Sequence, residues 1–112
     1  MGNSYSYSDY LRAIDNETDR TAIIKTIQPL FDLYDQDKSG TLSGFELTRV
    51  IESIGQYLYN TKLSEHDKRR YHLGHIYYWV NKTLDVNSDG RITKQEFASK
   101  IKQLLENPKK DL

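Results

Sequence analysis

Cysteine is absent from this chain of 112 residues. Its absence excludes disulfides, thiolate metal sites and palmitoylation, and it is compatible with a reducing intracellular setting. Long apolar runs are absent as well. No stretch approaches the roughly 20 apolar residues that a membrane-spanning helix needs, and no apolar secretory segment lies near the start. We therefore expect a cytoplasmic protein.

A surplus of charge of either sign is also missing. Sixteen basic and sixteen acidic side chains give a formal net charge of zero, so the composition gives no indication of a nucleic-acid partner. Hydrophobic residues make up 37% of the chain, which is low but sufficient for a small helical protein with a charged surface. At this length one core, and hence a single small domain, is expected.

Two twelve-residue segments carry the same pattern of oxygen-bearing side chains. Residues 35–46 read DQDKSGTLSGFE and residues 85–96 read DVNSDGRITKQE. Each segment has oxygen-bearing side chains at positions 1, 3, 5, 9 and 12 and glycine at position 6, and a compact loop with this spacing can supply the six to eight oxygen ligands of Ca²⁺. The glycine permits a sharp turn because it tolerates positive φ. The pattern predicts two calcium-binding loops, and polar turns between helices are the alternative.

Both segments resemble the calcium-binding loop of the EF-hand family. The resemblance implies two bound Ca²⁺ ions, with Mg²⁺ as a competitor, and a glutamate at position 12 that binds with both oxygens. In the first loop the implied ligands are Asp35, Asp37, Ser39, the carbonyl of Thr41, Ser43 directly or through water, and Glu46. In the second loop they are Asp85, Asn87, Asp89, the carbonyl of Arg91, Thr93 and Glu96.

Apolar residues recur at helical spacing on both sides of each loop. With the resemblance, they predict an all-α fold of paired EF-hands, each a helix–loop–helix unit facing one core. The resemblance also implies a short antiparallel β pairing of the loops at their position 8, where Leu42 and Ile92 supply suitable aliphatic side chains. The second unit has the poorer apolar face, because Asn81 stands where the first unit has Phe31.

The chain is expected to divide into three parts. Residues 1–16 form an N-terminal segment with an extra helical stretch, residues 17–107 form the paired EF-hand domain, and residues 108–112 form a flexible tail. Within the domain, the first hand covers about residues 18–59 and the second about residues 64–106.

Two features affect the predicted helix boundaries. Pro29 lies inside the first helix, where it removes a hydrogen bond, and we favour one kinked helix over two pieces with Pro29 opening the second. The connection between the hands is long, and Ser64 can cap a helix there together with Asp67. We expect this helix to run to about Leu84. The length of the connection loosely resembles that of sarcoplasmic calcium-binding proteins and calexcitin.

Histidine and tryptophan side chains in this second helix leave alternatives open. His72 and His75 lie one turn apart, and with His66 they could form a transition-metal site. We favour solvated side chains, because no cysteine joins them. Trp79 lies off the apolar stripe, and we interpret it as packing against residues 7–14, with a partner or self-association surface as the alternative.

The start of the chain matches an N-myristoylation pattern, with Gly2 after the initiator and Ser6 four residues later. This beginning is similar to that of recoverin-type calcium sensors. The pattern predicts reversible contact with a membrane surface, because a single myristoyl chain binds only marginally, and hence a peripheral-membrane location beside the cytoplasmic one. A chance match is the alternative.

No nucleophile paired with a base and no phosphate-binding glycine loop can be found in the sequence, so an enzyme is not expected. We expect a calcium-binding protein, acting as a small intracellular sensor that changes conformation and engages a protein partner. A calcium buffer and a calcium-dependent structural or self-assembling module are the alternatives. Met1 is the only methionine, so an adaptable methionine-rich target groove is not expected.

Overall fold

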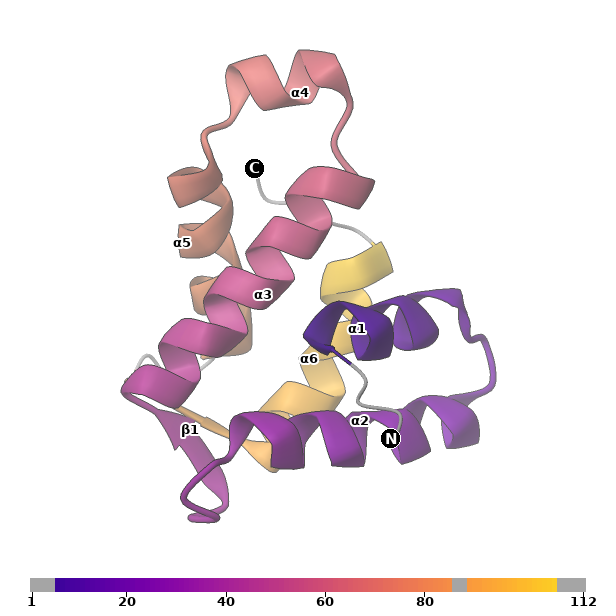
Figure 1. Ribbon diagram of the computed structural model, residues 1–112, viewed down its shortest axis with the longest axis vertical. Helices are drawn as coiled ribbons and strands as arrows, with labels where there is room; N and C mark the ends of the chain where they lie inside the picture. The colour runs from indigo at the N-terminus through magenta and orange to yellow at the C-terminus, as the bar shows by residue number, and fades with distance from the viewer. Residues whose placement is uncertain (1–5, 86–88, 107–112) are drawn as a thin grey trace.

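The computed structural model describes residues 6–85 and 89–106, and the predictions for Gly2, Asn87 and the tail 108–112 lie outside the described residues. The described residues form six α-helices and two short strands (Figure 1). In chain order these are α1 (Tyr7–Asn16), α2 (Arg20–Tyr34), β1 (Thr41–Ser43), α3 (Phe45–Thr61), α4 (Glu65–Arg70), α5 (Leu73–Leu84), β2 (Arg91–Thr93) and α6 (Lys94–Glu106). This architecture confirms the predicted fold class.

The two strands hold the loops together. β1 and β2 pair in antiparallel fashion, and Leu42 lies opposite Ile92. Both side chains are fully buried, so the small sheet also belongs to the core. We call α2, β1 and α3 hand 1, and α5, β2 and α6 hand 2. The expected pairing between the hands is confirmed.

The apolar faces of both hands and of α1 meet in one core. Leu11 and Ile14 of α1 are fully buried, and α1 packs on α2, α3 and α6. Tyr34 lies at the centre of an aromatic cluster, stacked on Tyr7 at 4.4 Å and edge-on to Phe97 at 5.9 Å between ring centroids. The extra N-terminal helix is therefore part of the folded domain. Within the described residues, no helix has the length and apolar character to cross a membrane.

The first two helices have well-defined beginnings. Ser6 and Asp9 form a reciprocal capping box, so α1 begins at Tyr7. Asp19 caps α2 through the backbone N–H of Thr21. Pro29 lies inside α2, which continues through it as one helix, so the two-piece alternative is wrong.

The prediction of one helix running unbroken from Ser64 to Leu84 is wrong, because the structure has two helices there, α4 and α5. The predicted capping box of Ser64 and Asp67 is present, but the chain leaves the helix at Tyr71, where φ is −116° and ψ is 122°. The residues of α4 are all polar or charged and none is buried. Since no residue of α4 is buried, core packing does not hold α4 in line with α5, and α4 forms a short bridge from the end of α3 back to the start of α5 (Figure 1).

The expectation for Trp79 also needs correction. Only 6% of Trp79 is exposed, and it belongs to the hydrophobic core, so the interpretation as an exposed partner or self-association surface is wrong. The main packing partners of its helix α5 are α3 and α6, rather than the N-terminal segment. His66, His72 and His75 are exposed, in agreement with the favoured interpretation of solvated side chains.

Candidate metal centre

The first loop begins at Asp35, which ends α2 and is 4% exposed. Its two carboxylate oxygens accept the backbone N–H groups of Ser39 at 3.1 Å and Gly40 at 2.9 Å. Gly40 has φ of +88°, a backbone conformation that residues other than glycine rarely adopt. The turn at position 6 therefore folds the loop back over the Asp35 carboxylate.

Asp37 and Glu46 close the same loop from its two ends. The backbone N–H of Asp37 donates to Oε2 of Glu46 at 3.1 Å. Hydrogen bonds from the Ser39 hydroxyl and backbone lower the pKa of the exposed Asp37 carboxyl below its ordinary value, so Asp37 is ionised at neutral pH. The loop thus brings an anionic side chain of its first turn towards a glutamate of the following helix.

Three carboxylates converge in this loop. Asp35, Asp37 and Glu46 each offer one oxygen, and these oxygens lie within 4.8 Å of one another. Oε1 of Glu46 is buried and has no hydrogen-bond partner among the described residues. Like charges at this distance repel, and a buried polar atom without a partner is rare. The donor set is entirely oxygen, as Ca²⁺ prefers, so these residues fit a hard divalent cation, which would supply the compensating positive charge.

The other predicted ligands of the first loop lie close to one another. The Ser39 hydroxyl donates to the carbonyl oxygen of Thr41 at 2.9 Å. Ser43 follows on β1, in the strand pair. The structure brings these oxygens into one loop with the three carboxylates, and their assignment as ligands stays a prediction.

The second loop begins in the same way. Asp85 ends α5 and is 5% exposed. Its carboxylate accepts the backbone N–H groups of Asp89 at 3.3 Å and Gly90 at 2.8 Å, and Asp89 accepts that of Arg91 at 3.0 Å. The hydrogen bonds of the Asp85 carboxylate therefore match those of the Asp35 carboxylate in the first loop.

The end of the second loop is different. Oε1 of Glu96 accepts the backbone N–H of Thr93 at 2.9 Å, and the Thr93 hydroxyl accepts the backbone N–H of Glu96 at 3.1 Å. This reciprocal pair is a capping box at the start of α6. Among the acidic and histidine side chains that the structure describes, the carboxylate group of the first loop has no counterpart in the second. Glu96 is thus held at the helix start.

Position 10 of the loop explains the difference. In hand 1 this residue is Gly44, with φ of +57° and ψ of −124°, and it makes the N-cap of α3 itself. In hand 2 it is Lys94, the first residue of α6. Glu46 is consequently the second residue of its helix and Glu96 the third, and the capping box needs the third. Sequence reasoning missed this role of Gly44, although the glycine was a visible signal.

Comparison with known proteins identifies the family. The model of the EF-hand domain pair matches residues 24–102, which covers both loops and all four hand helices in whole or in large part. No curated protein and no solved structure gave a significant match, so the likeness to sarcoplasmic calcium-binding proteins and calexcitin stays a prediction. The chain belongs to the EF-hand family, and it is a calcium-binding protein with two paired hands.

Proposed function

We propose that the protein is a calcium sensor, which changes conformation on loading and then engages a protein partner. The observation that supports this function is the capping box of Glu96 with Thr93. Before Glu96 can act as the last ligand of its loop, its carboxylate must leave the Thr93 N–H and rotate. Loading of hand 2 is therefore coupled to a rearrangement at the start of α6.

That rearrangement is placed where it can reach the core. Phe97 follows Glu96 directly and is fully buried. Its ring lies edge-on to Phe31 at 5.8 Å and to Tyr34 at 5.9 Å between centroids. Packed cores respond to small shifts by repacking rather than by continuous deformation. A shift at the start of α6 therefore changes the contact between the two hands, as a sensor requires.

A calcium buffer is the second candidate, and hand 1 is the observation that favours it. Its three carboxylates are already gathered, so little rearrangement accompanies binding there. Buffer EF-hands open little on binding, whereas sensor hands open and expose an apolar groove.

For the sensor function, we expect affinities of roughly 10⁻⁷–10⁻⁵ M for both loops, and a target surface formed by aliphatic and aromatic side chains.

Binding of an apolar fluorescent dye distinguishes the two functions. We expect dye fluorescence to rise when Ca²⁺ is added to the wild-type protein, and we expect the variant Glu96→Gln to lose most of this rise. Glutamine can still cap a helix, so the variant removes the carboxylate ligand while retaining a capping group. Glu52→Gln is the matched control, because Glu52 is exposed on α3. A wild-type protein that binds Ca²⁺ without any dye response would be a buffer.

A further inference from the structure

Helix α1 lies outside the two hands and covers a face formed by three of their four helices, α2, α3 and α6 (Figure 1). Tyr7, Tyr10, Leu11 and Ile14 occupy positions i, i+3, i+4 and i+7 of α1 and pack against the core. This spacing is the one by which an amphipathic helical peptide fills an apolar groove on another protein. Helix α1 thus occupies this face of its own protein in the way that a bound peptide would.

The C-terminal end of α1 is held by polar groups from both hands. The Asp15 carboxylate pairs with Lys62 at 2.8 Å and accepts the Tyr57 hydroxyl at 2.9 Å. Nζ of Lys102 donates to the carbonyl oxygens of Ile14 and Asp15 at 2.9 and 2.8 Å. We call Tyr57, Lys62 and Lys102 the C-terminal clamp. Burial and the hydrogen bond to Asp15 raise the pKa of Tyr57 to about 12, so its hydroxyl stays a donor at neutral pH.

The clamp defines the chemistry that this face recognises. Lysine side chains near a helix C-terminus bind its last free carbonyl groups and complement its dipole. The clamp adds a site for one carboxylate at the same end. Tyr57 lies in α3, Lys62 directly follows α3, and Lys102 lies in α6. All three lie outside the two loops. The face therefore suits an amphipathic helix with an acidic residue at its C-terminal end.

The other end of α1 is connected to the calcium loops. The ring of Tyr7 stacks on Tyr34 with an angle of 7° between the planes. Tyr34 directly precedes Asp35, the first residue of the first loop, and Phe97 directly follows Glu96, the last residue of the second loop. Both rings belong to the cluster that supports Tyr7. A shift at the start of the first loop, or the expected rearrangement at the end of the second, therefore alters the support of α1.

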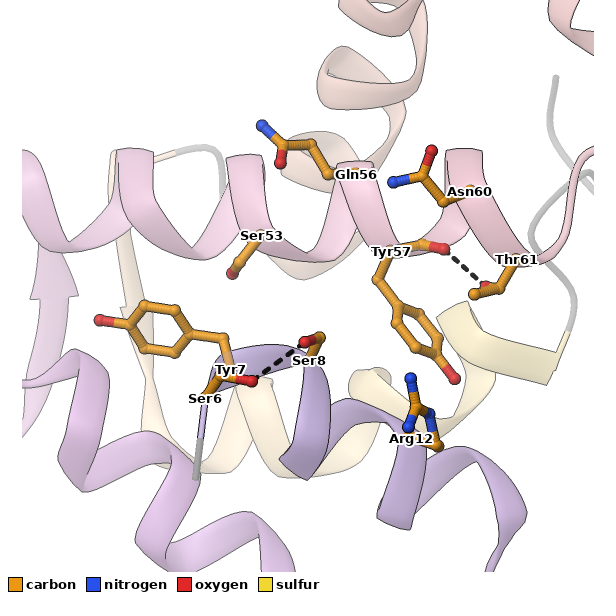
Figure 2. Close-up of a pocket in the computed structure, with 9 residues that line it drawn as sticks. All are labelled: Ser6, Tyr7, Ser8, Arg12, Ser53, Gln56, Tyr57, Asn60 and Thr61. Atoms are coloured by element: carbon orange, nitrogen blue, oxygen red, sulfur yellow. Dashed lines mark hydrogen bonds between the residues drawn. The ribbon is translucent and has the colours of Figure 1, made fainter. Parts of the chain in front are cut away.

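The contact between α1 and α3 is incompletely filled. A pocket of about 390 Å³ lies along it (Figure 2). Ser8 and Arg12 line it from α1, and Ser53, Gln56 and Asn60 line it from α3. Tyr7 and Tyr57 line it as well, so the two helices leave open space between them along this side rather than packing closely. The α1–α3 contact is therefore suited to opening.

We propose that α1 is an intramolecular occupant of the partner-binding face, released in the calcium-loaded protein and replaced by a helix of the partner. The partner helix has large apolar residues at i, i+3, i+4 and i+7 and a carboxylate at i+8, as α1 has in Tyr7, Tyr10, Leu11, Ile14 and Asp15. This inference rests on the proposed sensor function and specifies its partner. A second copy of the chain is the competing occupant.

Hydrogen exchange of the full chain tests the release without any variant. We expect the amides of α1 to exchange at least about tenfold faster with Ca²⁺ than with chelator, because opening of α1 alone lowers their protection. The amides of α3 should keep theirs. If dye binding rises with Ca²⁺ while the protection of α1 is unchanged, the sensor function stands and this inference is wrong. If neither changes, the sensor function fails and the inference fails with it.

Binding of a labelled peptide of residues 6–17 tests the partner. A tethered α1 has an effective concentration in the millimolar range, so the variant Leu11→Ala/Ile14→Ala of the full chain is used to weaken it. We expect this variant to bind the peptide and the wild type to exclude it in chelator. The peptide Asp15→Asn should bind at least about tenfold more weakly, because a charged hydrogen bond is lost.

The peptide Glu17→Gln is the matched control, since it removes the same charge next to the same end of α1, and in the structure the Glu17 carboxylate accepts the backbone N–H groups of Thr18 and Asp19. Equal binding of the two substituted peptides would overturn the role of the clamp. If the double variant does not fold, the wild type with Ca²⁺ is titrated with the peptide, and an unchanged affinity relative to chelator would overturn the inference. Calcium-dependent dimers that bind no peptide would assign the face to a second copy.

Discussion

Hand 1 and hand 2 share the same twelve-residue ligand spacing, but the helix after the loop begins one position earlier in hand 2. In hand 1 the last glutamate, Glu46, turns into the loop and accepts the N–H of Asp37. In hand 2 Glu96 turns back and caps α6 through Thr93. The first residues of the loops, Asp35 and Asp85, make nearly the same hydrogen bonds. The hands therefore differ at the end of the loop, where a single residue shifts the beginning of the helix.

The comparison shows how a ligand pattern and a capping pattern compete for one side chain. Both loops end in the capping-box signature of a hydroxyl residue followed three residues later by glutamate, Ser43 with Glu46 and Thr93 with Glu96. Only the second forms the box, because Gly44 takes over as the N-cap of α3. A glycine at position 10 thus leaves the glutamate available to the loop.

The helices before the loops differ as well. Phe31 of α2 is buried in the aromatic cluster, whereas its counterpart Asn81 of α5 has a buried Oδ1 without a partner among the described residues. Nε1 of Trp79, on the same helix, is also buried without a partner there. Unsatisfied buried polar atoms destabilise a fold. Among the described residues hand 2 has two such atoms and hand 1 has one, Oε1 of Glu46, which a bound cation would satisfy. We therefore expect hand 2 to be the less stable half and the one more easily rearranged.

Calcium should have the largest effect on the stability of the whole domain. At a free ion concentration 100 times the dissociation constant, each occupied site contributes about 2.7 kcal/mol, so two sites should raise the melting temperature by on the order of 10 °C or more. The measurement is thermal unfolding with Ca²⁺ and with chelator. Glu46→Gln should lose about half of the rise, and Glu96→Gln should lose less than that. Identical melting curves with and without Ca²⁺ would contradict binding to the folded state.

Calcium affinity should separate the two glutamates. Glu46→Gln should lower the affinity of the first loop by more than about 100-fold, exceeding the range of about 10–100-fold typical of losing an outer-shell partner. Glu96→Gln should cost its own loop less, because the wild-type carboxylate must first leave Thr93. The untouched loop should weaken modestly through Leu42 and Ile92.

Isothermal titration of both variants measures these affinities, with Glu52→Gln as the control. Equal losses in the two loops would show that the capping box of hand 2 has no effect on binding. A variant that still binds two ions with unchanged affinity would contradict the assignment of its glutamate as a ligand.

Gly44→Ala tests why the hands differ. A Cβ atom would meet nothing within 4 Å, so the cost arises from the backbone, where φ of +57° is strained for alanine by about 1–3 kcal/mol. The strain also favours moving the N-cap to Ser43 and Glu46 into a capping box, so the first loop should lose affinity. Gly74→Ala is the control, because Gly74 lies in α5 with open space around it and ordinary φ.

Denaturant unfolding of these two variants should give opposite signs. Alanine is favoured over glycine inside a helix by about 0.5–1 kcal/mol, so Gly74→Ala should stabilise while Gly44→Ala destabilises. A stable Gly44→Ala variant with unchanged calcium affinity would remove the explanation given for the position of Glu46.

The sequence predicted those features that depend on local spacing. The strand pair at Leu42 and Ile92 was predictable from the resemblance of the loops to those of the EF-hand family, in which an aliphatic residue suits position 8. The capping box at Ser64 was predictable for the same local reason. The predicted ligand sets remain predictions, although the structure gathers Asp35, Asp37 and Glu46 in one loop.

The features that sequence reasoning missed depend on tertiary packing or on competing local patterns. The break at Tyr71 arises because α4 has no buried residue, and helical propensity alone does not report what a helix packs against. Trp79 is buried because it shares the i, i+3, i+4 spacing of the buried Ile76 and Val80, so the core face of α5 is centred differently from the stripe expected. Glu96 is a cap because its signature serves two functions, and the choice depends on the residue at position 10.

Asn81→Leu should have the smallest effect and tests which hand is weaker. The change removes the buried Oδ1 that has no partner among the described residues, and leucine is also the better helix former. We expect stabilisation by about 1 kcal/mol, measured as a higher denaturant midpoint in chelator. Asn60→Leu is the control, because Asn60 is exposed on α3 and an exposed substitution typically stays within about 0.5 kcal/mol.

If Asn81→Leu gains no more stability than Asn60→Leu, the buried polar atom of Asn81 does not destabilise the fold. Hand 2 would then owe its rearrangement to the capping box of Glu96 alone, and the dye response should be unaffected by Asn81→Leu. If the gain is real, a stabilised hand 2 resists rearrangement, and the same variant should need more Ca²⁺ to reach half of its dye response.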